Sequence, residues 1–352
     1  MTFVDGREIT MRVLVGISGG LDSAYAAIKL MRDGHEVEGA ILIMHEYTEV
    51  DAAKSVALEI GIKLHLIDCR ERFKAVTDNF VSEYSRARTP NPCIVCNPLV
   101  KFRCLYDFAM SHGFDKIATG HYARVESFTL DGETRYAIAG AKDSKKDQTY
   151  MLYRLPQDIL SALVFPLSDD EKSEVRLAAG EESLSVADKK DSQEICFIPD
   201  RDYASYIESI KGVFPEGDFI GENGEILGRH KGIIKYTVGQ RKGLGISAGQ
   251  RIFVTKIDPI ANTVTLSTEG GSKGKVSVSD IVFSGMTEPT APENRRVSVK
   301  LRYSAKPIDA VAIFDGKGGA ELLLSAPQRA VTPGQSAVMY CEDRILCGGF
   351  ID

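Results

Sequence analysis

The sequence predicts an α/β fold in which an N-terminal half built on a parallel sheet is followed by smaller β-rich units. In the first 120 residues, short apolar runs alternate with segments of helical periodicity, which is typical of a parallel sheet covered on both faces. After about Ile198, helical periods largely stop and turn signals separate short apolar runs, a pattern typical of small barrels or sandwiches. The length of 352 residues suits two or three domains.

The individual elements follow from the spacing of apolar residues, which differs between strands and helices. In the N-terminal half, strands are predicted at 11–17, 37–44, 63–67 and 116–119, and helices at 22–32, 50–60, 71–85 and 99–110. In the C-terminal half, strands are predicted at 251–257, 263–267, 296–303, 310–314 and 337–340. The glycine-rich stretch 269–275 reads as a linker, so we expect domains at 11–200, 201–270 and 275–352.

Composition limits the class of protein. Charged residues make up 26% and hydrophobic residues 43%, as in ordinary soluble globular proteins. The longest apolar stretches fall far short of the roughly 18 residues that a membrane span needs, so no membrane partner is expected. Seven cysteines, an odd number, and no secretory signal in the first ten residues predict a reduced, cytoplasmic protein. The net charge of −6, taken alone, argues against a nucleic-acid partner.

The most informative string is SGGLDS, residues 18–23, which follows the first predicted strand and opens the first predicted helix. Its glycines let the backbone approach a ligand, and the helix start offers unpaired N–H groups to an anion. Asp22 is placed to hold a cation that neutralises phosphate charge. The alternative is a glycine turn with a Ser or Asp helix cap. The string resembles the loop of the ATP pyrophosphatase (PP-loop) superfamily, which implies adenylation of a substrate oxygen with release of pyrophosphate.

Two groups of cysteines are candidates for chemistry. The stretch RTPNPCIVCNPLVKF, residues 88–102, predicts a stiff proline-rich loop that presents Cys93 and Cys96 before a helix. With Arg88 and Lys101 close in sequence, such a thiol is expected to have a lowered pKa. The alternative is half of a zinc site, but zinc usually needs four ligands, and we expect no structural metal.

The other cysteines stand apart along the chain. Cys196 lies in KKDSQEICFIP, after Lys189 and Lys190, and from the residues alone it could equally be an inert core cysteine. The remaining cysteines sit in apolar or turn contexts and are expected to be inert: Cys69, Cys104, Cys341 and Cys347.

Eight strings, in order from residue 11 to about 340, together resemble the bacterial tRNA-specific 2-thiouridylase family. They are VGISGGLDSA, RTPNPCIVCNPLVKF, ATGHYAR, KKDQTYMLYRL, KKDSQEICFIP, YTVGQRKGLGI, LRYS and PGQSAV. The resemblance implies a PP-loop domain of the adenine nucleotide alpha-hydrolase-like type, a small central domain and a C-terminal β-barrel.

The resemblance also implies the reaction, that of a tRNA-uridine 2-sulfurtransferase. ATP, with Mg2+, would adenylate the carbon-2 oxygen of the wobble uridine at position 34, and a cysteine persulfide would supply sulfur, giving 2-thiouridine, AMP and pyrophosphate. Cys96 matches the nucleophile and Cys196 the persulfide carrier, and the two would form a transient disulfide. The implied partners are tRNA acceptors for Lys, Glu and Gln, and a persulfide donor, either a cysteine desulfurase or a relay protein.

Further site residues are implied by the same resemblance. Cys93 stands where some members carry an aspartate, and His121 could instead be a satisfied strand-end histidine. The ATP contacts would be Gly16, Ile17, Ser18, Gly19, Gly20, Leu21, Asp22, Ser23, Leu42 and Gly120. The target-base contacts would be Asn91, Pro92 and Cys93, and the tRNA contacts His121, Lys146, Asp147, Gln148, Arg302, Tyr303 and Gln335.

The distribution of charge leaves room for tRNA. Residues 228–256 contain seven basic residues and no acid, and residues 294–306 contain five and no acid. These segments hold +12, so the remaining 310 residues carry −18. Two such runs favour a phosphate-binding face over solvated strand surfaces. The competing hypotheses are a PP-loop ligase or amidotransferase that adenylates a small metabolite, and a non-catalytic RNA-binding protein in which SGGLDS would be idle.

Overall fold

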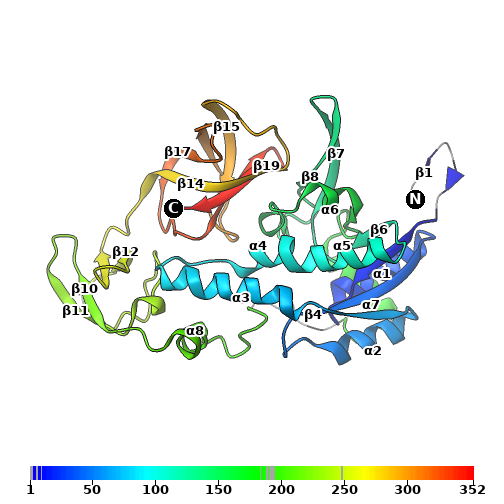
Figure 1. The fold of residues 1–352 in the computed structure, drawn as a ribbon, viewed down its shortest axis with the longest axis horizontal. Coiled ribbons are helices and arrows are strands. Elements are labelled where there is room, and N and C mark those ends of the chain that lie inside the picture. Colours follow the sequence, from blue (N-terminus) through cyan, green and yellow to red (C-terminus); the bar gives the residue numbers. More distant parts are fainter. Residues whose placement is uncertain are drawn as a thin grey trace.

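The structure is a computed structural model that describes residues 10–182, 184–187, 189, 195–246 and 249–352, together with the backbone of β1 (Phe3–Val4) and β2 (Arg7–Glu8). Lys190 and the rest of 190–194, in the Cys196 motif, lie outside the described residues. Figure 1 shows an N-terminal α/β unit, a small central unit and a C-terminal barrel. The predicted fold class is confirmed. Within the described part of the chain, no helix is long and apolar enough to cross a membrane.

The N-terminal unit is built on a five-stranded parallel sheet with the order β5-β4-β3-β6-β9. The strands are β3 (Arg12–Gly16), β4 (Glu36–Ile43), β5 (Leu64–Asp68), β6 (Lys116–Ala118) and β9 (Leu163–Val164). The strand order reverses between β3 and β6, because β4 and β5 lie on one side of β3 and β6 and β9 on the other. Ligands of such sheets bind beyond the carboxyl ends of the strands at this reversal. The loops after β3 and β6 therefore mark the expected site.

Helices α1 (Leu21–Arg32), α2 (Val50–Ile60), α3 (Arg70–Ser85), α6 (Gln157–Ala162) and α7 (Lys172–Glu181) accompany this sheet. The central strand β3 is fully buried at Val13, Leu14 and Val15, as expected for a strand covered on both faces. The strands and helices predicted up to residue 85 are confirmed.

The prediction for residues 88–102 is partly wrong, because helix begins earlier than expected. Residues Pro92–Cys96 form α4, Asn97–Lys101 form the π-helical turn η1, and Phe102–Ser111 form α5. Asn91 caps α4 by accepting a hydrogen bond from the N–H of Cys93 at 3.1 Å. An Asn cap followed by Pro is a strong helix start. The stiff loop therefore ends at Asn91, and both cysteines of this segment are helical.

A β-hairpin that the sequence did not predict extends from the N-terminal unit toward the barrel (Figure 1). It consists of β7 (Arg124–Leu130) and β8 (Glu133–Ala139). Ala139 pairs with Arg344 of the barrel, and near the hairpin tip Asp131 accepts a hydrogen bond from the Thr287 hydroxyl at 2.7 Å. The hairpin therefore braces the two units against each other.

The central unit combines α8 (Tyr203–Lys211) with a sheet of order β11-β10-β13-β12. Its strands are β10 (Gly217–Ile220), β11 (Ile226–His230), β12 (Phe253–Asp258) and β13 (Thr263–Ser267). Helix α8 lies where helical periods were expected to stop. It forms because Asp202 caps it by accepting from the N–H of Ser205 and because its Ile207 is buried in the core.

The barrel is closed because β14 pairs with both β17 and β19. Its strands are β14 (Lys273–Phe283), β15 (Glu293–Lys300), β16 (Ile308–Phe314), β17 (Ala320–Gln328), β18 (Ser336–Cys341) and β19 (Arg344–Ile351). Residues 273–275, expected in a linker, already belong to β14, so the linker is shorter than predicted.

Thr89 lies where the three units meet. Its N–H donates to the carbonyl of Pro333 at 2.8 Å, and its carbonyl accepts from the side-chain amide of Gln335 at 2.7 Å. Its hydroxyl lies 3.2 Å from that of Thr237 in the central unit. Gly334 packs so closely on Thr89 that a Cβ there would lie 2.9 Å from the Thr89 nitrogen. This junction immediately precedes the segment that carries Cys93 and Cys96.

Replacing Tyr150 by Phe should weaken the contact between the N-terminal unit and the barrel. The Tyr150 hydroxyl donates to the carbonyl of Ser336 at 3.0 Å and accepts from its N–H at 3.1 Å, in a fully buried setting. We expect Tyr150→Phe to lower the free energy of unfolding by about 1–3 kcal/mol, measured by urea denaturation. Tyr303→Phe, at a partly exposed position, is the control and should cost less than about 0.5 kcal/mol. Equal effects of the two changes would contradict the role of this contact.

Candidate functional site

The SGGLDS segment forms a tight loop between β3 and α1. Gly19 adopts a φ of +73°, and a Cβ there would lie 2.8 Å from Cβ of Ala52 in α2. The N–H of Ser18 donates to the hydroxyl of Ser23 at 3.2 Å. No described side chain caps the start of α1 at Gly20. The first turn of α1 therefore points its N–H groups into the loop, the arrangement that binds an anion.

Gly120, in the loop after β6, lies against this first turn. A Cβ at Gly120 would come within 2.5 Å of the main-chain carbon of Asp22 and 2.7 Å of the nitrogen of Ser23. Only glycine fits such an approach without moving the helix. The loops after β3 and β6, predicted to share the ATP site, are thus in contact. Leu42, the predicted adenine neighbour, is buried near the carboxyl end of β4, at the same edge of the sheet.

Two lysines that the sequence analysis did not place in the ATP site bring positive charge to the phosphate loop. Lys172, buried at the start of α7, donates to the Asp22 carboxylate at 2.5 Å, and the Tyr122 hydroxyl donates to the same oxygen at 3.0 Å. Lys189 donates to the carbonyl of Gly19 at 3.1 Å and pairs with Glu49. Asp22 was predicted to hold a cation, and in this structure the ammonium of Lys172 takes that place. A pairing across 150 residues of chain leaves no local signal in the sequence.

Cys96 is buried in the hydrophobic cluster that also contains Leu42. Its sulfur lies 3.8 Å from the sulfur of Met44, which follows β4. Burial raises the pKa of Cys96 to about 12, although the charge of Lys101 acts in the opposite direction. The predicted lowering of this pKa is wrong because the thiol is buried in the apolar cluster. Arg88, the other basic residue noted nearby in sequence, is paired with Glu83 at 2.7 Å.

Cys196 joins the same neighbourhood from a distant part of the chain. The adjacent Phe197 is buried against Phe73 and Phe80 of α3, with ring centroids 5.5 and 5.4 Å apart, and it belongs to the cluster that holds Cys96. Cys196 is exposed, yet the surrounding protein raises its pKa to about 11, with a further increase from Cys93 and a decrease from Lys101.

The charge of Cys196 in turn raises the pKa of Cys96, and so does that of Cys93. The predicted pair Cys96 and Cys196, together with Cys93, is therefore brought within electrostatic reach, with Lys101 among them. Lys101 was noted only as a sequence neighbour of these thiols. Its place one π-helical turn after Cys96 could not be seen without the backbone conformation.

His121 lies beside this group. Its Nδ1 is 2.8 Å from the Thr119 hydroxyl, and its ring packs near Phe102 and Phe165. Burial, and to a lesser degree the charge of Lys101, lower the pKa of His121 to about 3. The imidazole is therefore neutral at physiological pH. It can donate or accept a hydrogen bond but cannot contribute a positive charge.

The predicted tRNA-contacting residues lie between the N-terminal unit and the barrel. The pKa of Tyr303 is raised first by burial and then by Asp147 and Cys93, while Lys146 lowers it, so these groups are neighbours. Arg302 is exposed beside Tyr303. Other members of the set are engaged within the protein: Asp147 with Thr149 and Lys300, Gln148 with the main chain of Tyr122, and Gln335 with Thr89.

The two basic segments carry less unpaired positive charge than their sequence suggests, because some of their basic residues form ion pairs with acids. Five of the twelve basic residues form ion pairs with acids: Arg229, Lys235, Lys256, Arg295 and Lys300. The other seven are exposed and form no ion pair within the described part of the chain: Lys231, Arg241, Lys242, Arg251, Arg296, Arg302 and Lys306. The positive surface is therefore smaller than the sequence total of +12 suggests.

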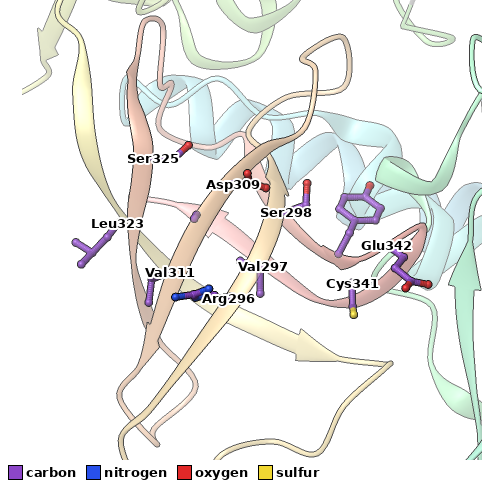
Figure 2. Close-up of a pocket in the computed structure, with 11 residues that line it drawn as sticks. Arg296, Val297, Ser298, Asp309, Val311, Leu323, Ser325, Cys341 and Glu342 are labelled. Atoms are coloured by element: carbon purple, nitrogen blue, oxygen red, sulfur yellow. The ribbon is translucent and has the colours of Figure 1, made fainter.

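A shallow pocket of about 510 Å³ lies on the barrel (Figure 2). It is lined by Arg296 and Ser298 of β15, Asp309 of β16, and Cys341 and Glu342 at the end of β18. Its charges have mixed sign, and none of the predicted site residues lines it. The pocket is therefore separate from the thiols and the phosphate loop.

Comparison with known proteins agrees with this arrangement. Three family models match the chain: "tRNA methyl transferase HUP domain" over residues 11–200, "tRNA methyl transferase PRC-barrel domain" over 205–268 and "Aminomethyltransferase beta-barrel domain" over 273–351. Among solved structures, a 4-thiouridine synthetase–RNA complex with bound ATP covers 56% of this chain and 50% of its own, at 13% identity and a TM-score of 0.35. That score is too low to support a conclusion about this chain.

Curated relatives match over almost the whole length. The tRNA-specific 2-thiouridylase MnmA of Clostridioides difficile is 42% identical over 97% of this chain and 98% of its own. The protein of the same name from Acetivibrio thermocellus is also 42% identical, over 97% of this chain and 99% of its own. With this identity along the full length, the chain belongs to the tRNA-specific 2-thiouridylase family.

Proposed function

We propose that this protein is a tRNA-uridine 2-sulfurtransferase that replaces the carbon-2 oxygen of the wobble uridine with sulfur. The observation that carries the proposal is that Cys96 and Cys196, 100 residues apart in sequence, lie within electrostatic reach of each other, and that Phe197, next to Cys196, shares the buried cluster of Cys96 and Leu42. An adenylating loop beside two thiols suits sulfur transfer, because adenylation turns an oxygen into a good leaving group and a persulfide supplies the nucleophile.

ATP fits the loop between β3 and α1. The uncapped first turn of α1, the close approach of Gly19 and Gly120 and the nearby ammonium groups of Lys172 and Lys189 together suit a polyphosphate. The uridine oxygen would attack the α-phosphorus, and pyrophosphate would leave. The Asp22 carboxylate is an oxygen ligand of the type that Mg2+ prefers. When bound, Mg2+ would neutralise phosphate charge, and Lys172 would then be released from Asp22 toward the phosphates.

The sulfur would come from a persulfide on Cys196, which is exposed and so accessible to a donor protein. Its terminal sulfur would attack carbon 2 of the adenylated uridine, and AMP would leave. The Cys96 thiolate would attack the inner sulfur, forming the Cys96–Cys196 disulfide and leaving the terminal sulfur on carbon 2. A thiol reductant would then restore both cysteines. The proposal fits the free state of all seven cysteines, which suits a reducing compartment such as the cytoplasm.

The raised pKa values mean that both thiols are protonated in the free protein at neutral pH. Forming the Cys96 thiolate therefore requires a base or a local positive charge. Lys101 supplies charge to both thiols, and neutral His121 stands nearby as a hydrogen-bonding group. Burial protects Cys96 from unwanted alkylation and oxidation until the substrate is bound.

The RNA partner would lie between the N-terminal unit and the barrel. Tyr303 of the barrel approaches Cys93, next to the predicted target-base residues Asn91 and Pro92, and exposed Arg302 lies beside it. The lysine, glutamate and glutamine tRNAs are the proposed acceptors. The donor is proposed to be a cysteine desulfurase or a relay protein.

The alternative, a ligase or amidotransferase that adenylates a small metabolite, leaves the meeting of the two thiols without a purpose. Cys96→Ser and Cys196→Ser should each abolish formation of 2-thiouridine, measured on mercury gels with tRNA, Mg-ATP and a persulfide donor. Cys341→Ser, which removes an exposed barrel thiol, is the matched control and should retain wild-type activity. Wild-type rates for both catalytic variants would favour the alternative, and ADP as the product would refute the adenylation step.

Removing the charge of Lys101 should raise the pKa of both reactive thiols further. The folded pKa values of about 12 and 11 exceed the ordinary value of 9.0, so thiolate forms only as the pH rises toward these values. Between pH 8 and 10, alkylation of Cys96 and Cys196 by iodoacetamide should increase about tenfold per pH unit. Lys101→Met should slow both reactions at each pH, whereas Lys74→Met, on the exposed face of α3, should not. An unchanged rate in Lys101→Met would show that this ammonium does not act on the thiols.

A further inference from the structure

A π-helical turn directly follows Cys96 and separates α4 from α5. The helical run of α4, η1 and α5 is continuous, and η1 interrupts its regular spacing. Pro98, the second residue of η1, has no N–H, so it cannot make the bond to the carbonyl four residues earlier that an α-helix requires. At the end of the turn, the N–H of Phe102 donates to the carbonyl of Asn97, five residues before it. Single π-turns occur often at functional sites, and this one begins at the residue next to the buried thiol.

The side chain of Asn97 fixes this turn to a distant part of the chain. It is 1% exposed, and its Nδ2 donates to the carbonyl of Met151 at 2.8 Å. A carbonyl oxygen only accepts hydrogen bonds, so the amide is oriented with its NH2 group toward Met151. Its Oδ1 atom is buried and has no hydrogen-bond partner among the described residues. An apolar side chain of this size would avoid an unpaired buried oxygen, so the bond to Met151 is what an amide provides at this place.

Met151 belongs to the short 3-10 helix η2 (Thr149–Met151), which is bonded to the barrel. The Thr149 hydroxyl lies 3.1 Å from the hydroxyl of Tyr340 in β18. The Tyr150 hydroxyl is bonded to both main-chain groups of Ser336, at the start of the same strand. All four of these residues are buried, so η2 is held to β18 without competition from water.

The residue before η2 connects this helix to the phosphate loop. The side chain of Gln148 accepts from the N–H of Tyr122 at 2.8 Å, and the N–H of Gln148 donates to the Tyr122 carbonyl at 3.0 Å. The Tyr122 hydroxyl in turn donates to Asp22 of the phosphate loop at 3.0 Å. Hydrogen bonds and short stretches of chain therefore link the phosphate loop and the barrel to η2, and Asn97 links η2 to the segment of Cys96.

We propose that Asn97 is a positioning residue for sulfur transfer, an inference that rests on the function proposed above. Its amide holds the π-turn against η2 and so fixes Cys96 relative to the phosphate loop and the barrel. Thr89 holds the other end of the reactive segment to the barrel, and Lys101 ends the turn that Asn97 begins. Without the amide, the turn can move away from η2. Cys96 then loses its defined position, and its thiol becomes more accessible.

The test compares Asn97→Ala with Gln157→Ala in the full chain. Gln157 is the matched control because its side-chain amide also anchors a helix, α6, through bonds to both main-chain groups of Tyr136 in the hairpin at 2.7 and 2.8 Å. Removing either amide should destabilise the protein, and urea denaturation shows by how much. In single turnovers with tRNA, Mg-ATP and persulfide-loaded enzyme, Asn97→Ala should form 2-thiouridine more slowly by about tenfold or more, with unchanged affinities for tRNA and ATP. Gln157→Ala should keep the wild-type rate.

A second readout does not depend on the reaction. Iodoacetamide at one fixed pH, followed by peptide mapping, should modify Cys96 severalfold faster in Asn97→Ala than in the wild type, and at the wild-type rate in Gln157→Ala. If Asn97→Ala does not fold, Asn97→Asp should give the same two results, because it keeps the size of the side chain and removes the donor to Met151.

Equal alkylation of Cys96 in the wild type and the Asn97 variant would overturn the positioning role. Equally faster alkylation in the Asn97 and Gln157 variants would also overturn it, because loss of stability alone would then explain the effect. A wild-type protein that forms no 2-thiouridine would refute the proposed function, and the alkylation comparison would still decide whether Asn97 positions Cys96.

Discussion

Thr89 holds the reactive segment at the meeting point of all three units. Its N–H and carbonyl are bonded to Pro333 and Gln335 of the barrel, and its hydroxyl contacts Thr237 of the central unit. The helix that carries Cys93 and Cys96 begins three residues later. The positions of these thiols therefore depend on the docking of both β-rich units. A change in that docking on RNA binding would move the site, because Cys93 and Cys96 lie within about one helical turn of this junction.

Burial makes the thiolate of Cys96 harder to form and also protects the thiol. Removing Cys96 from water raises its pKa and keeps it protonated, which protects it while no substrate is present. The same low-polarity surroundings strengthen the action of any charge that remains, and Lys101 is that charge for both Cys96 and Cys196. A lysine charge also lies at the phosphate loop, where Lys172 neutralises Asp22 at the place where an anion is expected to bind.

Much of the fold could be predicted because local sequence patterns encode its helices and strands. Periodicity identified the strands and helices of the N-terminal unit, and SGGLDS located the loop at the strand reversal. The hairpin of β7 and β8 was missed although its signal is local, because the two strands pair with each other across the Asp131-Gly132 turn, a dipeptide typical of hairpins. The early start of α4 was missed because the Asn-Pro sequence that caps it also suits a loop. The parts of the site that could be predicted are those that belong to a sequence motif. The contact of Lys172 with Asp22 was not predicted, because it joins distant segments of the chain, and the pKa of Cys96 depends on burial that the sequence does not express.

The central claim is that Cys96 and Cys196 act on the same sulfur atom. The direct measurement is a single turnover of enzyme loaded with persulfide on Cys196, with excess tRNA and Mg-ATP and no reductant, quenched by acid. Non-reducing peptide mapping should then show the Cys96–Cys196 disulfide in equal amount to the 2-thiouridine formed. Formation of 2-thiouridine with Cys96 still a free thiol would contradict the account.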